Sequence, residues 1–88
     1  VNIIMTKKDK LLSRFKEKPK DFTWDDLTAM MKNFGYTLVK KSGSRRRFIN
    51  YETGDKVFIH EPHPDKKLKS YQIDQIYNHL IERGVIKE

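Results

Sequence analysis

Nineteen Lys and Arg residues against twelve Asp and Glu residues give this 88-residue chain a formal net charge of +7, which favours a polyanionic partner. The absence of cysteine excludes disulfide bonds and thiolate zinc sites, and it is consistent with a reducing cytoplasm. We expect residues 1–88 to form a single small domain, and no apolar run is long enough to span a membrane.

The first predicted helix covers residues 7–16, where Leu11, Leu12 and Phe15 fall on one face at helical spacing. Pro19 lies just beyond this segment and is expected to end the helix. We expect residues 1–6 to form a disordered lead-in. Met5 is a candidate natural start, which would place residues 1–4 upstream of it.

The second predicted helix has clear signals at both ends. Thr23 is a natural N-cap, and Asp25 and Asp26 lie in the first turn, where the helix dipole favours negative charge. Gly35 supplies the left-handed residue that commonly follows a helix. We expect Trp24 to be a packing residue, and we expect a buried face that consists of Leu27, Met30, Met31 and Phe34.

After Gly35 the hydrophobic pattern changes from helical spacing to the alternation typical of strands. We predict strands at residues 36–41, 45–51 and 56–60, joined by turns at residues 42–43 and 52–55. In the second strand Phe48 and Ile49 point to opposite faces, so the alternation leaves the buried face of this strand open. The segment is therefore predicted to be an antiparallel meander.

The third predicted helix begins near Ser70 and stops at Gly84, with Val85 folding back on Leu80. His79 lies off the apolar stripe of this helix, and we expect it to be solvated. The element order α-α-β-β-β-α predicts an α+β fold, with helices on one face of the sheet and the other face available for function. The residues expected on the buried stripe are Ile73, Ile76, Tyr77, Leu80 and Ile81.

Two clusters of basic residues predict contacts with the phosphates of a nucleic acid. The first contains no acidic residue, and the second directly precedes the third helix, whose N-terminus near Ser70 adds to a phosphate site. The alternative for the arginine run is a solvated strand edge that discourages aggregation. The clusters consist of Lys40, Lys41, Arg45, Arg46 and Arg47, and of Lys66, Lys67 and Lys69.

Two histidines, His60 and His63, follow the first basic cluster. Imidazole takes or gives a proton near neutral pH, so both are candidates for proton transfer. His60 ends the third predicted strand, where antiparallel pairing could bring it near Arg45 or Arg47. The alternative is a structural role, with hydrogen bonds to loop carbonyls or to phosphate. We predict no metal site, because Pro62 argues against a helical pair and no third ligand is evident.

Four aromatic side chains could stack on nucleotide bases. In so small a domain we expect at least half of them to belong to the core instead. These residues are Phe48, Tyr51, Phe58 and Tyr71.

Several short motifs of this chain occur together in one known family. They are Phe34, Gly35 and Tyr36, the turn at Gly43 and Ser44, Val57 and Ile59, a histidine-containing loop, and Lys66, Leu68 and Lys69. Through these motifs the chain resembles, from about Leu11 to Ile86, the HicA family of bacterial toxin ribonucleases. The resemblance implies a fold similar to a double-stranded-RNA-binding domain, cleavage of messenger RNA without a metal or cofactor, a cytoplasmic location, and neutralisation by a HicB-like antitoxin.

One residue departs from the pattern of this family. The resemblance implies a catalytic histidine directly after the Gly43 and Ser44 pair, and this chain has Arg45 there. RNA cleavage without a metal needs a base for the 2′-hydroxyl, an acid for the leaving oxygen, and cations for the charge that builds on phosphorus. Arginine supplies only the cation, because its pKa is too high for it to release a proton at neutral pH.

Three interpretations therefore remain open. The first is a HicA-like endoribonuclease in which His60 or His63 has taken over proton transfer, with Arg45 stabilising charge and Ser44 and the basic clusters binding RNA. The second is an RNA-binding module of the same fold that does not cut. The third is a protein-interaction domain whose basic face docks an acidic partner.

Overall fold

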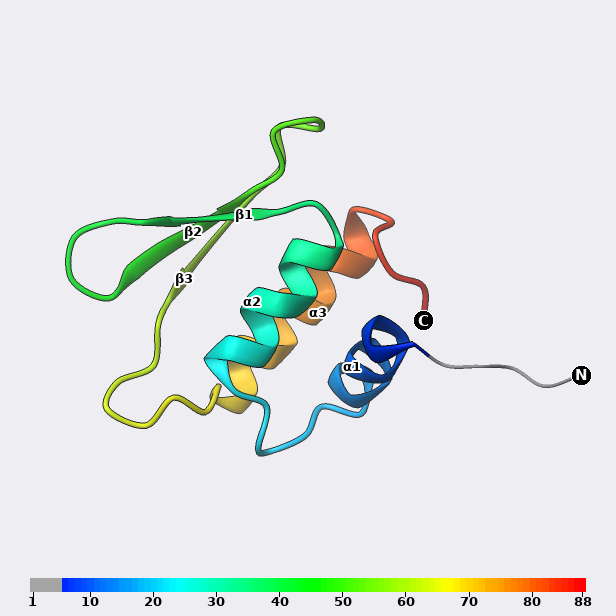
Figure 1. The fold of residues 1–88 in the computed structure, drawn as a ribbon, viewed down its shortest axis with the longest axis horizontal. Helices are drawn as coiled ribbons and strands as arrows, with labels where there is room; N and C mark the ends of the chain where they lie inside the picture. Colours follow the sequence, from blue (N-terminus) through cyan, green and yellow to red (C-terminus); the bar gives the residue numbers. More distant parts are fainter. Residues whose placement is uncertain (1–5) are drawn as a thin grey trace, which may run out of the picture.

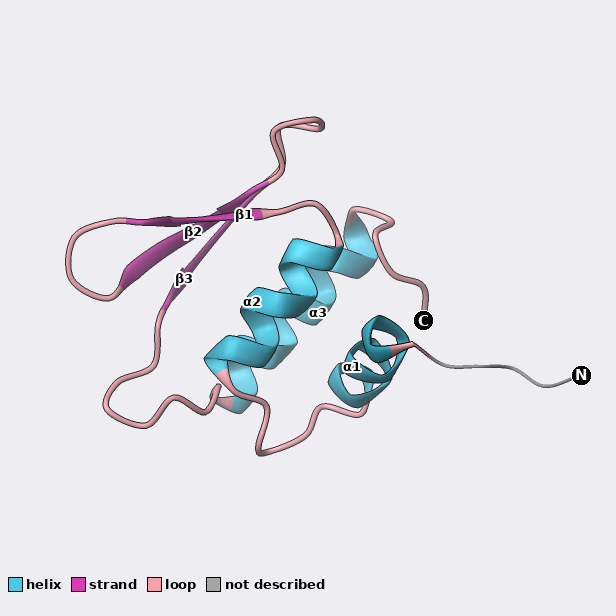
Figure 2. Cartoon of the chain, viewed as in Figure 1, coloured by secondary structure: helices cyan, strands magenta, loops and turns pink. Residues whose placement is uncertain are grey.

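The computed structural model describes residues 6–88, which form three helices and a three-stranded antiparallel sheet (Figures 1 and 2). The observed order confirms the predicted α-α-β-β-β-α fold. The helices are α1 (Lys7–Lys16), α2 (Trp24–Asn33) and α3 (Ser70–Glu82), and the strands are β1 (Thr37–Lys40), β2 (Arg45–Ile49) and β3 (Lys56–His60).

Side-chain caps start the first two helices where the sequence predicts. In α2 the Thr23 hydroxyl accepts from the Asp26 amide at 3.1 Å, and the Asp26 carboxylate accepts from the Thr23 amide at 3.1 Å. Thr6 and Asp9 form the same capping box at the start of α1. Thr6 is therefore the N-cap of a helix, whereas the rest of the expected lead-in and the candidate start at Met5 lie outside the described residues.

Strand β2 ends two residues earlier than predicted, and the side chain of Asn50 gives the reason. Its Oδ1 accepts from the backbone amides of Glu52 and Thr53 at 3.0 and 3.2 Å, which turns the chain away from the ladder. Tyr51 consequently lies in the turn and not in the strand. The predicted third strand, in contrast, matches β3 over its whole length.

The core lies between the sheet and helices α2 and α3, and α1 packs on the side of these helices away from the sheet (Figure 1). The rings of Trp24 on α2 and Phe48 on β2 lie 5.6 Å apart, which joins the helices to the sheet. The ring centres of Phe15 on α1 and Tyr77 on α3 lie 6.2 Å apart. Trp24 is buried, which confirms the prediction that it is a packing residue.

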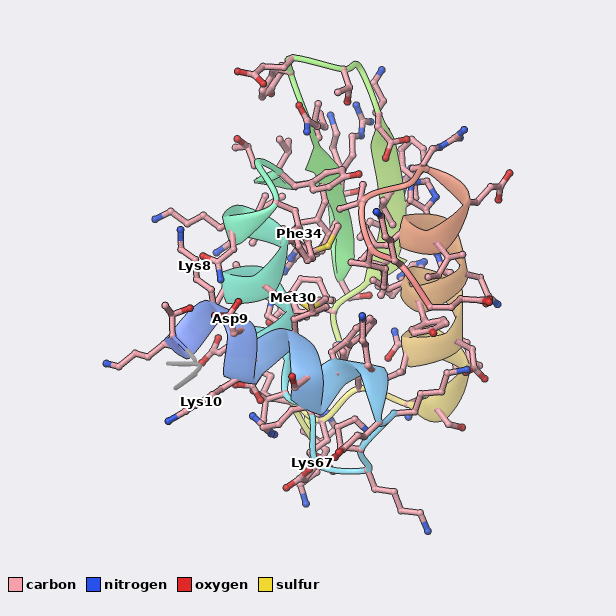
Figure 3. All side chains as sticks on the ribbon, turned by 90° about the vertical axis from the view of Figure 1, so that its right-hand side faces the viewer. Lys8, Asp9, Lys10, Met30, Phe34 and Lys67 are labelled. Carbon is pink, nitrogen blue, oxygen red and sulfur yellow. The ribbon has the colours of Figure 1, made fainter. Side chains whose placement is uncertain are left out.

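All three predicted helix faces contribute residues to the core. Met30 is enclosed at the centre of the molecule, whereas Lys8, Lys10 and Lys67 extend into solvent (Figure 3). Some stripe residues lie at the margin of their helix faces and are only half buried. These are Leu11, Leu12, Phe34, Tyr77 and Ile81.

The strand order β1-β2-β3 places the arginine-rich β2 at the centre of the sheet. The alternative in which this arginine run is a strand edge is therefore wrong. Phe48 belongs to the core between sheet and helices, whereas Ile49 is buried outside that core cluster. Since successive strand residues point to opposite faces, Phe48 marks the helix-facing side and Ile49 the open side.

The aromatic residues are distributed differently from the expectation. Of the four residues that we considered, only Phe48 is in the core, and Tyr51, Phe58 and Tyr71 are exposed at 72%, 60% and 63%. The helices supply most of the largest fully buried side chains, among them Phe15 and Met30, and the loop before α2 supplies Phe22. None of the helices in residues 6–88 is long and apolar enough to cross a membrane.

The prediction that His79 is solvated is wrong, because this side chain joins a partly buried polar cluster. His79 Nε2 lies 2.8 Å from the Asp55 carboxylate, which also accepts from the Tyr36 hydroxyl and from Arg83 at 3.1 Å. Burial raises the pKa of Asp55, but the hydrogen bonds from Tyr36 and His79 outweigh this effect and the net pKa is lowered. Burial, together with the hydrogen bond to Asp55, raises the pKa of Tyr36.

Candidate nucleic-acid interface

The helices leave one face of the sheet uncovered (Figure 1), and the strands that form it are rich in Lys and Arg. The three strands contain no Asp or Glu at all. On the helix-facing side β2 and β3 contribute Arg46, Phe48, Val57 and Ile59. The opposite side, which we call the open face, is made by Thr37, Val39, Lys41, Arg45, Arg47, Ile49, Lys56, Phe58 and His60.

His60 lies opposite Arg45 in the ladder of β2 and β3, which confirms the expected approach of these two residues. The carbonyls of His60 and Phe58 accept from side chains of α3, namely Gln72 and Gln75, each at 2.8 Å. These carbonyls therefore point away from β2, and His60 and Arg45 form a non-hydrogen-bonded pair, in which the side chains approach most closely.

The Ser44 hydroxyl lies 3.0 Å from His60 Nδ1. The backbone fixes this contact, because the Glu61 amide donates to the Ser44 carbonyl at 2.8 Å and extends the pairing beyond β2. A hydroxyl either donates or accepts, so Ser44 suits both the neutral and the protonated imidazole. No hydrogen bond within residues 6–88 involves His60 Nε2, which leaves this nitrogen available for proton transfer.

Arg47 and Phe58 form the next pair of the open face. The Arg47 guanidinium lies 5.2 Å from the centre of the Phe58 ring, within cation–π range. The buried Nε of Arg47 has no hydrogen-bond partner among the described residues. A hollow of about 280 Å³ beside this pair is lined by Lys41, Arg45, Arg46, Arg47, Phe58, Ile59 and His60.

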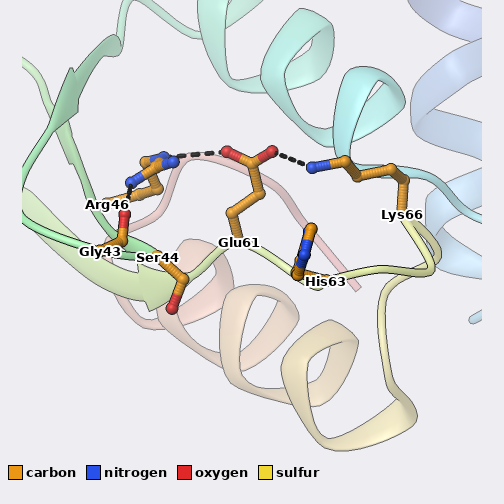
Figure 4. Close-up of a pocket in the computed structure, with 6 residues that line it drawn as sticks. All are labelled: Gly43, Ser44, Arg46, Glu61, His63 and Lys66. Carbon is orange, nitrogen blue, oxygen red and sulfur yellow. Dashed lines mark hydrogen bonds and ion pairs between the residues drawn. The ribbon is translucent and has the colours of Figure 1, made fainter.

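Glu61 organises a second hollow of about 390 Å³ around the loop after β3 (Figure 4). Its carboxylate accepts from Lys66 at 2.6 Å and from Arg46 Nε at 2.9 Å. The hydrogen bond from Lys66, supported by Arg46, lowers the pKa of Glu61. Arg46 also donates to the Gly43 carbonyl at 2.8 Å, so this arginine is held on the helix-facing side, apart from Arg45 and Arg47.

Glu61 did not stand out in the sequence, although a signal for it exists. It directly follows His60, and strand alternation turns it to the opposite face, where Arg46 also points. His63 lines the hollow of Glu61, together with Ser44, and its side chain is exposed. Within residues 6–88 no three metal-ligating side chains of the His, Cys, Asp and Glu types come together.

The second basic cluster is carried by a loop that is tied to the helices. The Trp24 amide donates to the Lys66 carbonyl and the Leu68 amide to the Phe22 carbonyl, both at 2.8 Å. Lys67 and Lys69 are exposed, and neither forms an ion pair with a carboxylate of residues 6–88. Lys69 is the N-cap residue of α3, so the cluster lies beside a helix N-terminus as expected.

The sequence-predicted residues thus fall into two neighbouring groups. Ser44 connects them, because it contacts His60 at the end of the open face and also lines the hollow that contains His63. Lys40 lies opposite Arg46 in the ladder of β1 and β2, so it belongs to the helix-facing side. Lys41, Arg45 and Arg47 remain on the open face with His60.

Comparison with known proteins identifies a family. The model of a family described as HicA toxin of bacterial toxin-antitoxin matches residues 24–82. This range begins at the first residue of α2 and ends at the last residue of α3. No curated protein and no solved structure matches the chain.

Proposed function

The chain belongs to the HicA toxin family, and from this premise we propose that it is an endoribonuclease that cleaves messenger RNA without a metal. We further propose that a HicB-like antitoxin neutralises it and that it acts in the cytoplasm. The observation that carries the proposal is the placement of His60 beside Arg45, with the Ser44 hydroxyl 3.0 Å from Nδ1.

His60 is the proposed proton-transfer group. When Nδ1 donates to the Ser44 hydroxyl, the lone pair lies on Nε2, which can take the proton of a 2′-hydroxyl. The 2′-oxygen then attacks the adjacent phosphorus, and the bond from phosphorus to the 5′-oxygen of the next nucleotide breaks. A protonated imidazole returns the proton to that leaving oxygen. Ser44 is a positioning residue, because it orients the ring and does not exchange the proton itself.

Arg45 is the proposed cation for the charge that builds on phosphorus. It lies opposite His60 and cannot itself act as a base. Lys41 and Arg47 continue the positive charge along the open face, and none of the three forms an ion pair with a carboxylate of residues 6–88. These residues are therefore free to bind the phosphates that flank the scissile bond.

The remaining basic residues have supporting roles in this proposal. Arg46 and Lys66 donate to both carboxylate oxygens of Glu61 and lower its pKa, so this carboxylate is a poor proton acceptor. Lys40, Lys67 and Lys69 are exposed and extend the electrostatic attraction for RNA beyond the site. His63 is the alternative proton-transfer group, and its position in the adjacent hollow motivates a direct comparison.

The decisive experiment compares His60→Ala with His63→Ala in the cleavage of single-stranded RNA in the presence of a chelator. We expect the first change to lower the rate by roughly 10² to 10⁴-fold while RNA binding is retained. His63→Ala is the matched control, because it removes an exposed imidazole from the neighbouring loop. RNA with 2′-deoxy sugars should resist cleavage. An unchanged rate in His60→Ala would contradict the assignment, and a loss in His63→Ala alone would transfer it to His63.

One observation favours a second candidate, an RNA-binding module that does not cut. Arg45 occupies the position where the family resemblance implies a catalytic histidine. The variant Arg45→His separates the two candidates: a gain of cleavage in this variant, with none in the unaltered chain, would establish the binding module and refute the role of His60.

A further inference from the structure

We propose that Phe58 is a stacking platform for one base of single-stranded RNA, next to the cleavage position. This inference rests on the proposed function and specifies how its substrate is held. It identifies a nucleobase subsite made by Phe58 and Arg47, two side chains that face each other across β2 and β3. The ligand is a segment of single-stranded RNA whose unpaired base lies flat on the ring.

The first argument is the exposure of Phe58. Its side chain is 60% exposed in the middle of β3, between the buried Val57 and Ile59. Most large apolar side chains of residues 6–88 are buried in the core. An exposed ring in the middle of a strand therefore has a face available for a partner. On the same face Val39 and Ile49 lie next to Arg47, so the pair of Arg47 and Phe58 is bordered by apolar side chains.

The second argument is the arrangement of Arg47. Its guanidinium lies 5.2 Å from the ring centre, and the side chain forms no hydrogen bond within residues 6–88. Cation–π contact holds both planar groups in place. The arginine can therefore bind a phosphate of the strand while the ring accepts the attached base, because aromatic stacking and phosphate binding together are the usual means of holding single-stranded nucleic acid.

The third argument is the spacing from the proposed reaction centre. Phe58 and His60 are two residues apart on the same side of β3, which corresponds to about 7 Å along a strand. That separation is comparable with the distance between consecutive nucleotides of an extended chain. A base stacked on Phe58 would therefore bring the sugar of a neighbouring nucleotide to His60.

Charge and shape favour RNA over an acidic protein as the occupant of this surface. The strands carry several cations and no carboxylate, which complements a phosphate backbone. Stacking on an aromatic ring requires an unpaired planar base, and bases within a duplex are already stacked on one another. The subsite is therefore specific for single strands and tolerant of sequence.

The test measures the affinity of the full chain for a single-stranded oligonucleotide with 2′-O-methyl sugars, which cannot be cleaved through a 2′-hydroxyl. We expect Phe58→Ala to weaken binding by about 5- to 150-fold, as for the loss of one base stack. Phe58→Trp should restore it. The dependence on salt should stay unchanged in Phe58→Ala, whereas Arg47→Ala should reduce the slope by about 0.7.

Tyr51→Ala is the matched control, because Tyr51 is 72% exposed in the turn at the far end of the sheet from His60. The subsite would be overturned if Tyr51→Ala and Phe58→Ala lost equal affinity for single-stranded RNA. It would also be overturned if Phe58→Ala lost as much affinity for duplex RNA as for single-stranded RNA. An oligonucleotide series with one abasic position supplies a second measurement. Removal of the base that stacks on Phe58 should weaken binding to the unaltered chain but cost little further affinity in Phe58→Ala. Additive losses at every position would also overturn the inference.

The same measurements separate this inference from the proposed function. If the unaltered chain binds and cuts RNA but Phe58→Ala does both equally well, the stacking subsite is wrong and the nuclease proposal stands. If the unaltered chain does not bind single-stranded RNA even at low salt, both proposals fail. Circular dichroism melting checks that each variant is folded, and because the Phe58 side chain is largely exposed we expect little change.

Discussion

Replacing Asp55 by asparagine tests whether the polar cluster at the far end of the sheet stabilises the fold. The carboxylate is 13% exposed and accepts from Tyr36, His79 and Arg83. Hydrogen bonds to a charged group contribute about 1.5 to 3 kcal/mol each when buried. Arg83 is 54% exposed, so solvent screening makes its share small. The amide oxygen of asparagine can still accept some of the hydrogen bonds from Tyr36 and His79. We therefore expect Asp55→Asn to lower the free energy of unfolding by about 2 to 4 kcal/mol.

Urea denaturation followed by circular dichroism measures this cost, and the pH dependence supplies a sharper check. The folded-state pKa of Asp55 is lowered, so its stabilisation is present above the unfolded value of 3.8 and is lost as the pH falls through the folded value. The difference between the unaltered chain and Asp55→Asn should therefore be large at neutral pH and shrink below about pH 4.

Asp74→Asn is the matched control for this experiment. Asp74 forms one ion pair with Lys18 at 2.7 Å, and its side chain is 51% exposed. Exposed pairs of this kind contribute about 0 to 1 kcal/mol. Equal costs for the two substitutions, or a cost of Asp55→Asn that does not change with pH, would refute the view that the buried carboxylate is the stabilising group.

Three further outcomes follow from the site. Ser44→Ala should lower cleavage by about 2- to 10-fold through loss of one neutral hydrogen bond to His60, and Ser44→Thr should restore it; equal cleavage by all three chains in a single-turnover assay would exclude positioning by this hydroxyl. Glu61→Gln should lower the free energy of unfolding, measured by urea denaturation, by about 1 to 2 kcal/mol, because it removes the charge that strengthens the hydrogen bond from Arg46. It should also raise RNA affinity, because negative charge is removed. Lys67→Ala should reduce the slope of log affinity against log salt by about 0.7, and an unchanged slope would place RNA elsewhere.

Helix boundaries were predictable because their signals are local. The capping box of Thr23 and Asp26 and the positive φ of 93° at Gly35 involve residues within a few positions of each helix end. The approach of His60 to Arg45 was also predictable, since a short hairpin fixes the register of its two strands. These features required no knowledge of how distant segments pack.

The parts that differed from expectation depend on contacts between distant segments. Asp55 and His79 are 24 positions apart, and their contact forms only when the end of the β2–β3 turn packs against α3. A polar residue beside the apolar stripe of a helix is expected to lie in solvent unless another segment supplies a buried partner. The hydrophobic spacing of the helix contains no information about such a partner. The exposure of Phe58 follows likewise from the choice of which sheet face the helices cover.

The free edge of β3 explains why the proposed site can be held accurately on so small a domain. An edge strand exposes unpaired backbone groups, and these groups must find other partners. Here the carbonyls of Phe58 and His60 accept from Gln75 and Gln72, which lie three residues apart on α3 and therefore on one helix face. Gln72 is itself 3% exposed. The helix thus fixes the backbone of Phe58 and His60, the two residues whose side chains form the proposed site. Their side chains stay in position although β3 has no second neighbouring strand in the sheet.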